Sequence, residues 1–334
     1  MKARTLVARG GSPHGRPLNP TMSAASAWRK VLQQLTDQMT SSVPGVLSGT
    51  EPEDLHAFRV AVRKIRTLLQ DGVQLVDPKS RERFRRAYRW LGDITTPTRD
   101  ADVHLIEFPK LVAALPSLRR EELAAFIDLL VRHRTACHAS MTVKLSSIRR
   151  AEFGAAWLRF LADDAAWTSC VELAKEPIIR ILFRRVEKAR RHLVKNGRKI
   201  SKKSPPTALH ELRKEGKRLR YLLECFTPLF DETPLDEVLR PLRKLQDVLG
   251  EFQDTEVQAN ALRELATELA SGKNRSALMA IRGAIEQLEG RGSDARAAFA
   301  KTFRRFDDRK VKHAFAQLEI PTASRKKLPP KKKP

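Results

Sequence analysis

Residues 209–226 read LHELRKEGKRLRYLLECF, and this stretch decides both the fold class and the candidate site. At 100° per residue on a helix, a histidine and three cations fall within a sector of roughly 80°: His210, Arg213, Lys217 and Arg220. Apolar residues form a second stripe centred roughly 100° from the first: Leu209, Leu212, Leu219, Leu223 and Phe226. The stretch predicts an amphipathic helix with a row of cations beside its packing face.

The same pattern occurs earlier in the chain, where residues 55–69 read LHAFRVAVRKIRTLL. Five polar positions match at one offset of 154 residues, and Leu55 and Leu68 match Leu209 and Leu222 at the same offset. We call the earlier set the first basic row: His56, Arg59, Arg63, Lys64 and Arg66. The later set is the second basic row: His210, Arg213, Lys217, Arg218 and Arg220. Either copy alone could be a solvated basic helix face, but two copies in register indicate an internal repeat.

The composition is that of a helical protein with an unusual charge. The chain has 334 residues, of which 41% are hydrophobic, 31% are charged and only 15 are glycine, so it can hold one large or two ordinary helical domains. Its net charge is +25, and +15 remains when residues 1–22 and 321–334 are left out. This excess predicts a polyanionic partner, which could be nucleic acid, polyphosphate or an anionic membrane surface.

Cysteines and apolar runs indicate the compartment. Cys137, Cys170 and Cys225 have no metal-like or CxxC spacing, and we interpret them as small buried residues in a reducing cytosol. No apolar run approaches the ~18–20 residues of a membrane span, and the basic N-terminus lacks the apolar stretch of a secretory signal. We therefore expect a cytoplasmic protein without a membrane span.

In the first half, helical periodicity predicts helices over 23–39, from near Pro52 to Gly72, over 80–91, from 101 onwards with interruptions at two prolines, over 117–145, and within 151–174. Residues 41–54, with two prolines and two glycines, are expected to form a loop. Gly92 and Pro97 predict a tight turn between the helices that flank them.

In the second half, the order of elements repeats. Helices are predicted over 177–195, across the second basic row, over 235–249 with a kink or restart at Pro241, and over 254–271, 274–289 and 293–318. No stretch is typical of a strand. The predicted fold is all-α, with one helical domain over 23–318 that divides into halves of about 23–175 and 176–318, and basic disordered tails over 1–22 and 319–334.

Sequence motifs of several enzyme classes are missing. The chain has no GxxxxGKS phosphate loop and no GxSxG nucleophile elbow, and the HExxH pattern fails because position 214 is Lys214. Asp100 and Asp254 match at the offset of 154 and could hold a metal ion. We favour the alternative that each caps the following helix or pairs with a cation of the basic rows. We expect no catalytic residues, no metal site and no cofactor.

The basic rows are suited to phosphate. Guanidinium groups make bidentate contacts with phosphate oxygens, and lysines add point charge. Like charges one turn apart lose roughly 0.2–0.5 kcal/mol per pair when no anion is present. His56 and His210 could each orient a backbone group, donate to an anion or, if the two helices meet, share a metal ion.

Nucleic acid is a weaker candidate because aromatic residues are only 6% of the chain and are not interleaved with the cations. A ligand that is all phosphate, without bases, fits this composition better.

Both repeat units resemble a known family. The helices of the two basic rows, together with LGDITTPTRDADV (91–103) and LQDVLGEFQDTEV (245–257), resemble the CHAD domain, the conserved histidine α-helical domain, over about residues 23–318. The resemblance implies two pseudo-symmetric antiparallel four-helix bundles around a basic central groove or pore. It also implies binding of inorganic polyphosphate, with some members associated with polyphosphate granules. The ten residues of the basic rows are the implied ligands, and weaker candidates follow them in the next helices: Arg85, Arg86, Arg243 and Lys244.

Two departures separate the repeat units. The second unit has Gln253 where the first has Arg99, and Gly216 where the first has Val62. Gly216 weakens its helix by about 1 kcal/mol relative to alanine but allows another helix or the ligand to approach closely.

Some relatives carry a triphosphate-hydrolysing domain marked by ExExK, which is missing here. We therefore expect a polyphosphate-binding module and not an enzyme, with granule-associated proteins as further partners. The alternatives are an RNA- or DNA-binding protein, and a phosphoanhydride hydrolase in which Asp100 and Asp254 hold Mg²⁺.

Overall fold

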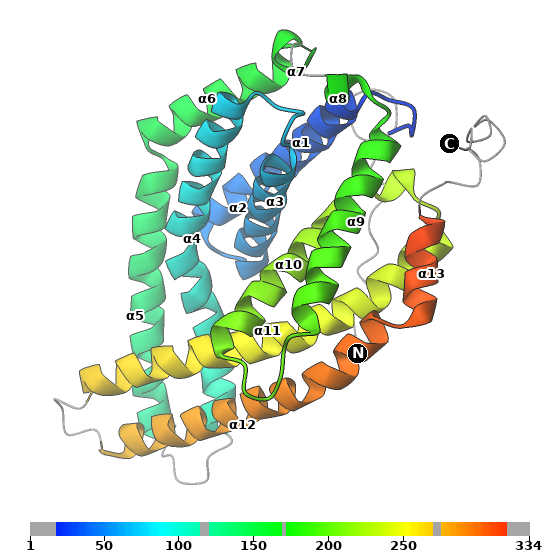
Figure 1. Ribbon diagram of the computed structural model, residues 1–334. Coiled ribbons are helices and arrows are strands. Elements are labelled where there is room, and N and C mark those ends of the chain that lie inside the picture. Colours follow the sequence, from blue (N-terminus) through cyan, green and yellow to red (C-terminus); the bar gives the residue numbers. More distant parts are fainter. Residues whose placement is uncertain (1–17, 114–119, 169–171, 270–274, 319–334) are drawn as a thin grey trace.

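The computed structural model describes residues 18–113, 120–168, 172–269 and 275–318 (Figure 1). Within these ranges the chain is helical, and the only extended pairing is an isolated bridge between Ser23 and Pro177. The all-α prediction is confirmed.

The helices of the first half are α1 (Ala24–Ser41), α2 (Val43–Ser48), α3 (Pro52–Asp71), α4 (Pro78–Ala113), α5 (Arg120–Leu145), α6 (Ile148–Ala162), α7 (Ala165–Thr168) and α8 (Glu172–Lys175). The helices of the second half are α9 (Ile178–Gly197), α10 (Pro206–Cys225), a 3-10 turn (Thr227–Leu229), α11 (Glu232–Leu269), α12 (Arg275–Phe306) and α13 (Arg309–Gln317).

The helices that carry the basic rows begin as their sequences predict. Pro52 lies in the first turn of α3, where a missing N–H costs nothing, and Glu53 and Asp54 follow it at the positive end of the helix dipole. Pro206 has the same place in α10. The first basic row therefore lies on α3 and the second on α10.

Several predicted breaks are wrong. Helix α4 continues through Gly92 and Pro97, α11 does not restart at Pro241, and α12 runs without interruption to Phe306. An internal proline costs about 3 kcal/mol, but each large apolar side chain that a continuous helix buries contributes about 1.5–3 kcal/mol. The expected loop over 41–54 also contains a short helix, α2.

Two apolar cores explain why the long helices stay continuous. The larger core is contiguous across both halves, and in it the rings of Trp28 on α1 and Phe226 after α10 lie 5.0 Å apart. The smaller core forms where the α4–α5 and α11–α12 hairpins meet, from residues such as Phe108, Leu130 and Leu262 (Figure 1). Helix α4 contributes to both cores, so a break near Pro97 would separate them.

Burial follows the sequence repeat outside the basic rows as well. Buried residues of α1 and α9 match at the offset of 154: Ala24 and Ile178, Ala27 and Ile181, Trp28 and Leu182, Leu32 and Val186, Leu35 and Ala189, Met39 and Leu193. Ser23 and Pro177, which form the bridge, are separated by the same offset. A residue faces its own repeat mate where a two-fold axis passes between them. The full arrangement of two four-helix bundles stays a prediction.

The ends of the helical domain differ in part from expectation. Residues 18–22 belong to the expected disordered tail, yet Leu18 and Met22 pack against the larger core, and Ile178 N donates to Met22 O at 2.8 Å. Residues 1–17 and 319–334 lie outside the described residues, as does Cys170. Cys225 packs against the larger core as expected.

Candidate polyanion-binding site

The two basic rows meet at Arg63 and Lys217, which are repeat mates. Helices α3 and α10 pack against each other. The pKa of Lys217 is lowered to about 7, first because its ammonium group is buried, and then because Arg213 and Arg63 lie close by. Asp254 opposes this shift, and Arg220 adds to it. A charge on α3 therefore acts directly on the centre of the second basic row.

Arg59 lies beside neutral oxygens of α4. Its Nη1 donates to Gly92 O at 2.9 Å, to Thr95 Oγ1 at 2.8 Å and to Thr96 Oγ1 at 3.1 Å. Its pKa is lowered to about 10, mainly by burial and then by Arg63, although Asp100 opposes the shift. Among the described residues, no carboxylate lies within ion-pair distance of this guanidinium, which is held by neutral oxygens.

The rest of the first basic row is similarly crowded with positive charge. Burial lowers the pKa of Arg66, and the neighbouring cations Arg89 and Arg85 lower it further against the effect of Asp93. The Nε of Arg63 is buried and has no hydrogen-bond partner within the described ranges. Arg63 and Arg66 have been partly removed from water without an ion pair to any acid in the described residues, which is unfavourable unless an anion binds.

The second basic row is partly neutralised by acids. Arg213 Nη2 donates to Asp254 Oδ1 at 3.0 Å, and Arg220 Nε lies 3.7 Å from Glu224 Oε1. The Nε atoms of Arg213 and Arg220 are nevertheless buried, and no described residue accepts a hydrogen bond from them. Both arginines keep hydrogen-bonding capacity for a further anion.

The neighbours of the two histidines occupy matching positions of the repeat but differ in charge. His210 Nδ1 donates to Gln253 Oε1 at 2.6 Å, while the repeat mate of Gln253, Arg99, acts on His56. The pKa of His56 is lowered first by burial, against Glu53, and then by Arg99 and other cations of the row. With Nδ1 of His210 occupied, its Nε2 donates to an anion only when the ring is protonated.

Asp100 and Asp254 lie inside helices α4 and α11, so the prediction that they cap helices is wrong. The alternative prediction, pairing with a row cation, is confirmed for Asp254. The pKa of Asp100 is raised by burial and by Asp254, against Arg59 and Arg99, which places the two carboxylates near each other. In the described ranges no group of three or more His, Cys, Asp or Glu side chains is placed to hold a metal ion.

Lys64 and Arg218 join the two helices in reciprocal ion pairs. Arg218 makes a bidentate contact with Asp71 of α3, whose side chain is 1% exposed, with Nε 2.9 Å from Oδ2. Lys64 Nζ lies 3.8 Å from Glu224 Oε2 of α10. Both cations hold the helix crossing together, and their role as ligands stays a prediction.

The four weaker candidates divide into two kinds. Arg85 is paired with Glu82 at 2.8 Å yet still acts on Arg66, and Arg243 lies 3.3 Å from Glu224. Arg86 and Lys244 are exposed side chains on α4 and α11. Arg85 and Arg243 therefore border the basic rows, whereas Arg86 and Lys244 would add only exposed charge.

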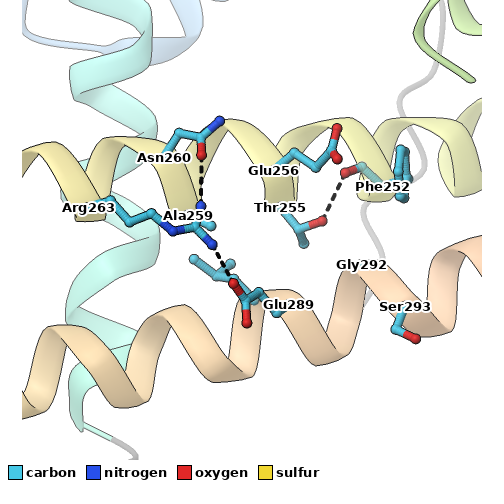
Figure 2. Close-up of a pocket in the computed structure, with 10 residues that line it drawn as sticks. Phe252, Thr255, Glu256, Ala259, Asn260, Arg263, Glu289, Gly292 and Ser293 are labelled. Atoms are coloured by element: carbon cyan, nitrogen blue, oxygen red, sulfur yellow. Dashed lines mark hydrogen bonds and ion pairs between the residues drawn. The ribbon is translucent and has the colours of Figure 1, made fainter. Parts of the chain in front are cut away.

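A cavity of about 250 Å³ between α11 and α12 differs chemically from the basic rows, and Figure 2 shows the residues that line it. Its cation, Arg263, contacts Glu289 and donates to Asn260 Oδ1 at 2.7 Å. Glu256 also lines it, and burial raises the pKa of that carboxyl group. Two acids beside one cation make this cavity unsuited to a polyanion.

The family model of the CHAD domain matches residues 30–263. The chain belongs to the CHAD domain family. It is 30% identical over 271 residues to the uncharacterized proteins Rv2226 and MT2285 of two Mycobacterium tuberculosis strains, H37Rv and CDC 1551 / Oshkosh. These matches cover 79% of the chain and 50% of each relative, so the chain spans about half the length of the curated relatives it matches.

Solved structures share the fold. The crystal structure of the CHAD domain from the plant Ricinus communis has a TM-score of 0.70 at 21% identity, over 87% of this chain and 95% of that one. PptA from Streptomyces chartreusis has a TM-score of 0.62 at 18% identity, over 86% of this chain and all of that one. The likeness shows that the helical arrangement of this CHAD domain recurs in distant sequences.

Sequence reasoning missed the partners that fix the rows: Thr95, Thr96, Asp71, Glu224 and Gln246. Thr95 and Thr96 could have been noticed because they lie inside the repeated motif at 91–103. Gln246 explains Gly216, since a Cβ at Gly216 would lie 2.3 Å from Gln246 Nε2 on α11. The close approach that this glycine was predicted to allow is therefore made by another helix.

Proposed function

We propose that this CHAD domain protein binds inorganic polyphosphate where the two basic rows meet. The observation that carries the proposal is the electrostatic effect of Arg63 on Lys217 where α3 packs against α10, which brings two rows of partly buried cations together. Each row alone resembles a solvated helix face, but the meeting of the rows concentrates positive charge that the nearby acids only partly offset. A chain of phosphates that spans both rows would supply the missing anions.

The surroundings of the tryptophans favour polyphosphate over nucleic acid. Trp28, Trp157 and Trp167 are fully buried, and Trp90 lies beneath the guanidinium of Arg149. Single-stranded nucleic acids bind through aromatic platforms on which bases stack. A ligand without bases makes no use of such a platform, so the site needs only its cations.

The test is a titration of the full chain with long-chain polyphosphate, followed by competition with RNA at matched phosphate concentration. The site variant is Arg59→Gln/Arg63→Gln/Arg213→Gln/Lys217→Gln. If each lost phosphate contact is worth about 1 kcal/mol, affinity falls by about 10³-fold. We expect RNA to compete poorly with polyphosphate on the wild type.

A matched control removes the same charge elsewhere: Arg282→Gln/Lys301→Gln/Arg304→Gln/Arg305→Gln, all exposed on α12. It should bind polyphosphate within a few-fold of the wild type at 150 mM salt, where distant charges are screened. Equal losses in both variants, or equal competition by RNA, would mean that the protein responds only to its net charge.

We further propose that the chain binds without catalysis and that polyphosphate granules are its cellular location. In the parts of the chain that the structure describes, no helix combines the length and apolar character that crossing a bilayer requires. Incubation with polyphosphate and Mg²⁺ should release no orthophosphate above background. Release that disappears in Asp100→Asn/Asp254→Asn would support the hydrolase alternative instead.

A further inference from the structure

A second basic pocket lies on the α9 side of α10, built from residues outside the functional prediction except Arg218. It has a volume of about 320 Å³ and lies between α9, α10 and the turn that follows α3. Four cations and one acid line it: Arg184, Arg185, Lys188, Arg218 and Asp71. Gln70 and Gln74 add amide groups at its wall.

The acid of this pocket is already neutralised. Asp71 accepts from Arg218 through both carboxylate oxygens. The other three cations are therefore in excess over the carboxylates that line the pocket. Arg184 Nη1 lies 3.8 Å from Glu176, which is not a lining residue, and Lys188 is exposed.

Arg185 shows that the pocket is more than a basic helix face. Its Nη2 donates to Val73 O at 2.6 Å, and its guanidinium lies over the Trp28 ring, 5.4 Å from the centroid. Its Nε is buried and has no hydrogen-bond partner in the part of the chain that the structure describes. A buried donor without a partner costs about 1–3 kcal/mol, so an oxygen acceptor entering the pocket would remove that cost.

Arg185 is not shared between the two repeat units. Helix α1 has Val31 at the matching position, a core residue with 2% exposure. The mates of Arg184 and Lys188 are Lys30 and Gln34, so this part of α1 carries one cation where α9 carries three. The basic pocket is thus a feature of the second half alone.

We propose that this pocket binds a compact phosphate group, of about the size of a diphosphate, as an anion site separate from the basic rows. Arginine forks and a lysine suit phosphate oxygens, and the volume lies at the small end of ligand sites. Lys217 and Arg218 are consecutive on α10 and point about 100° apart, so the pocket lies on a different side of that helix from Lys217, and Arg218 is the row residue that also lines the pocket. The inference stands independently of polyphosphate binding at the rows.

The test uses pyrophosphate as the probe, with calorimetry on the full chain. The variant Arg184→Gln/Lys188→Gln changes two exposed side chains and should weaken pyrophosphate binding at least tenfold. The control Arg180→Gln/Arg191→Gln removes the same charge from exposed positions of α9 outside the pocket and should leave binding unchanged. Equal losses in both variants, or no loss in either, would overturn the proposal.

A second comparison separates this site from the basic rows. Arg63→Gln/Lys217→Gln should keep pyrophosphate binding while losing long-chain polyphosphate. Arg184→Gln/Lys188→Gln should lose pyrophosphate binding while keeping that of long-chain polyphosphate. Pyrophosphate binding that depends on Arg63 and Lys217 instead would overturn the pocket and leave the proposed function standing. Loss of pyrophosphate binding in Arg185→Gln, with an unchanged melting temperature, would support the role of the buried guanidinium.

The same phosphate chemistry has two sources, the free anion and the end group of a polyphosphate chain. Short polyphosphate with free ends and with esterified ends distinguishes them. If the pocket holds chain ends, Arg184→Gln/Lys188→Gln weakens binding of the free-ended chains only. If it holds the free anion, that variant binds both forms like the wild type and loses pyrophosphate alone.

Discussion

The first basic row and the second basic row share their cation positions but differ in their acids. Arg59 is held by a carbonyl and two hydroxyl oxygens of α4, whereas its repeat mate Arg213 donates to the carboxylate of Asp254. Arg220 lies beside Glu224, whose repeat mate is the neutral Gln70. The two units therefore keep the cations but differ in how closely acids contact them.

Because of this difference, we expect the two rows to contribute unequally to polyanion binding. In the first basic row, Asp93 and Asp100 act on Arg66 and Arg59 only from beyond ion-pair distance. In the second, an acid lies beside three of the cations, Arg213, Arg218 and Arg220, whereas the ion pair of the first row is that of Lys64 with Glu224. An incoming polyanion should meet the stronger positive field at α3, and the cations of α10 should contribute less to the binding free energy.

The largest expected effect compares the rows directly. Arg59→Gln/Arg63→Gln/Arg66→Gln leaves Lys217 together with cations that stand beside acids, so polyphosphate affinity should fall by about 10³-fold. Arg213→Gln/Lys217→Gln/Arg220→Gln leaves the less neutralised row intact and should lower affinity by about 10²-fold. Calorimetry at fixed salt measures both. Equal losses would contradict the unequal roles of the rows.

The next comparison concerns the two reciprocal ion pairs, and its readout is stability. Arg218→Gln leaves the carboxylate of Asp71 buried without its cation, so the free energy of unfolding should fall by about 3 kcal/mol. Lys64→Gln breaks a looser contact with Glu224 and should cost less than about 1 kcal/mol. Urea denaturation of the ligand-free protein distinguishes the two. The account of the helix crossing is wrong if both variants lose the same stability.

The smallest effect follows from the pair at the centre, where the first basic row has Arg63 and the second has Lys217. With a pKa of about 7, Lys217 is charged below neutral pH and neutral above it. Because phosphate binds the charged form, polyphosphate affinity should fall several-fold between pH 6 and pH 8. Lys217→Arg should flatten this dependence, since a guanidinium remains charged. An identical pH profile in the variant would exclude Lys217 as its origin.

The lowered pKa of Lys217 also makes the stability of the fold depend on pH, in the opposite direction to that expected for a salt-bridged lysine. The folded-state pKa of Lys217 lies below its ordinary value, so burying the charged form destabilises the fold at pH below about 7. That penalty disappears as pH rises through 7 towards the ordinary pKa. Lys217→Met should therefore stabilise the ligand-free protein at pH 6 more than at pH 9, as thermal denaturation would show.

The sequence was sufficient for features that depend on local pattern. The basic rows, their offset and the start of α3 at Pro52 follow from helical periodicity and from the proline at the first turn. The continuity of α4 through Pro97 did not follow, because the cost of a proline is local whereas the two cores that outweigh it are assembled from distant segments. Neither did the pairing of Arg218 with Asp71, which joins residues 147 positions apart.

The central claim is that Arg63 and Lys217 belong to one site. A double-mutant cycle with Arg63→Gln, Lys217→Gln and the double variant, titrated with a short polyphosphate of defined length, tests it most directly. If both cations contact the same bound chain, the losses are non-additive by at least about 0.5 kcal/mol and each protein binds one chain at the rows. Additive losses, with two chains bound independently per protein, would show that the rows are separate surfaces.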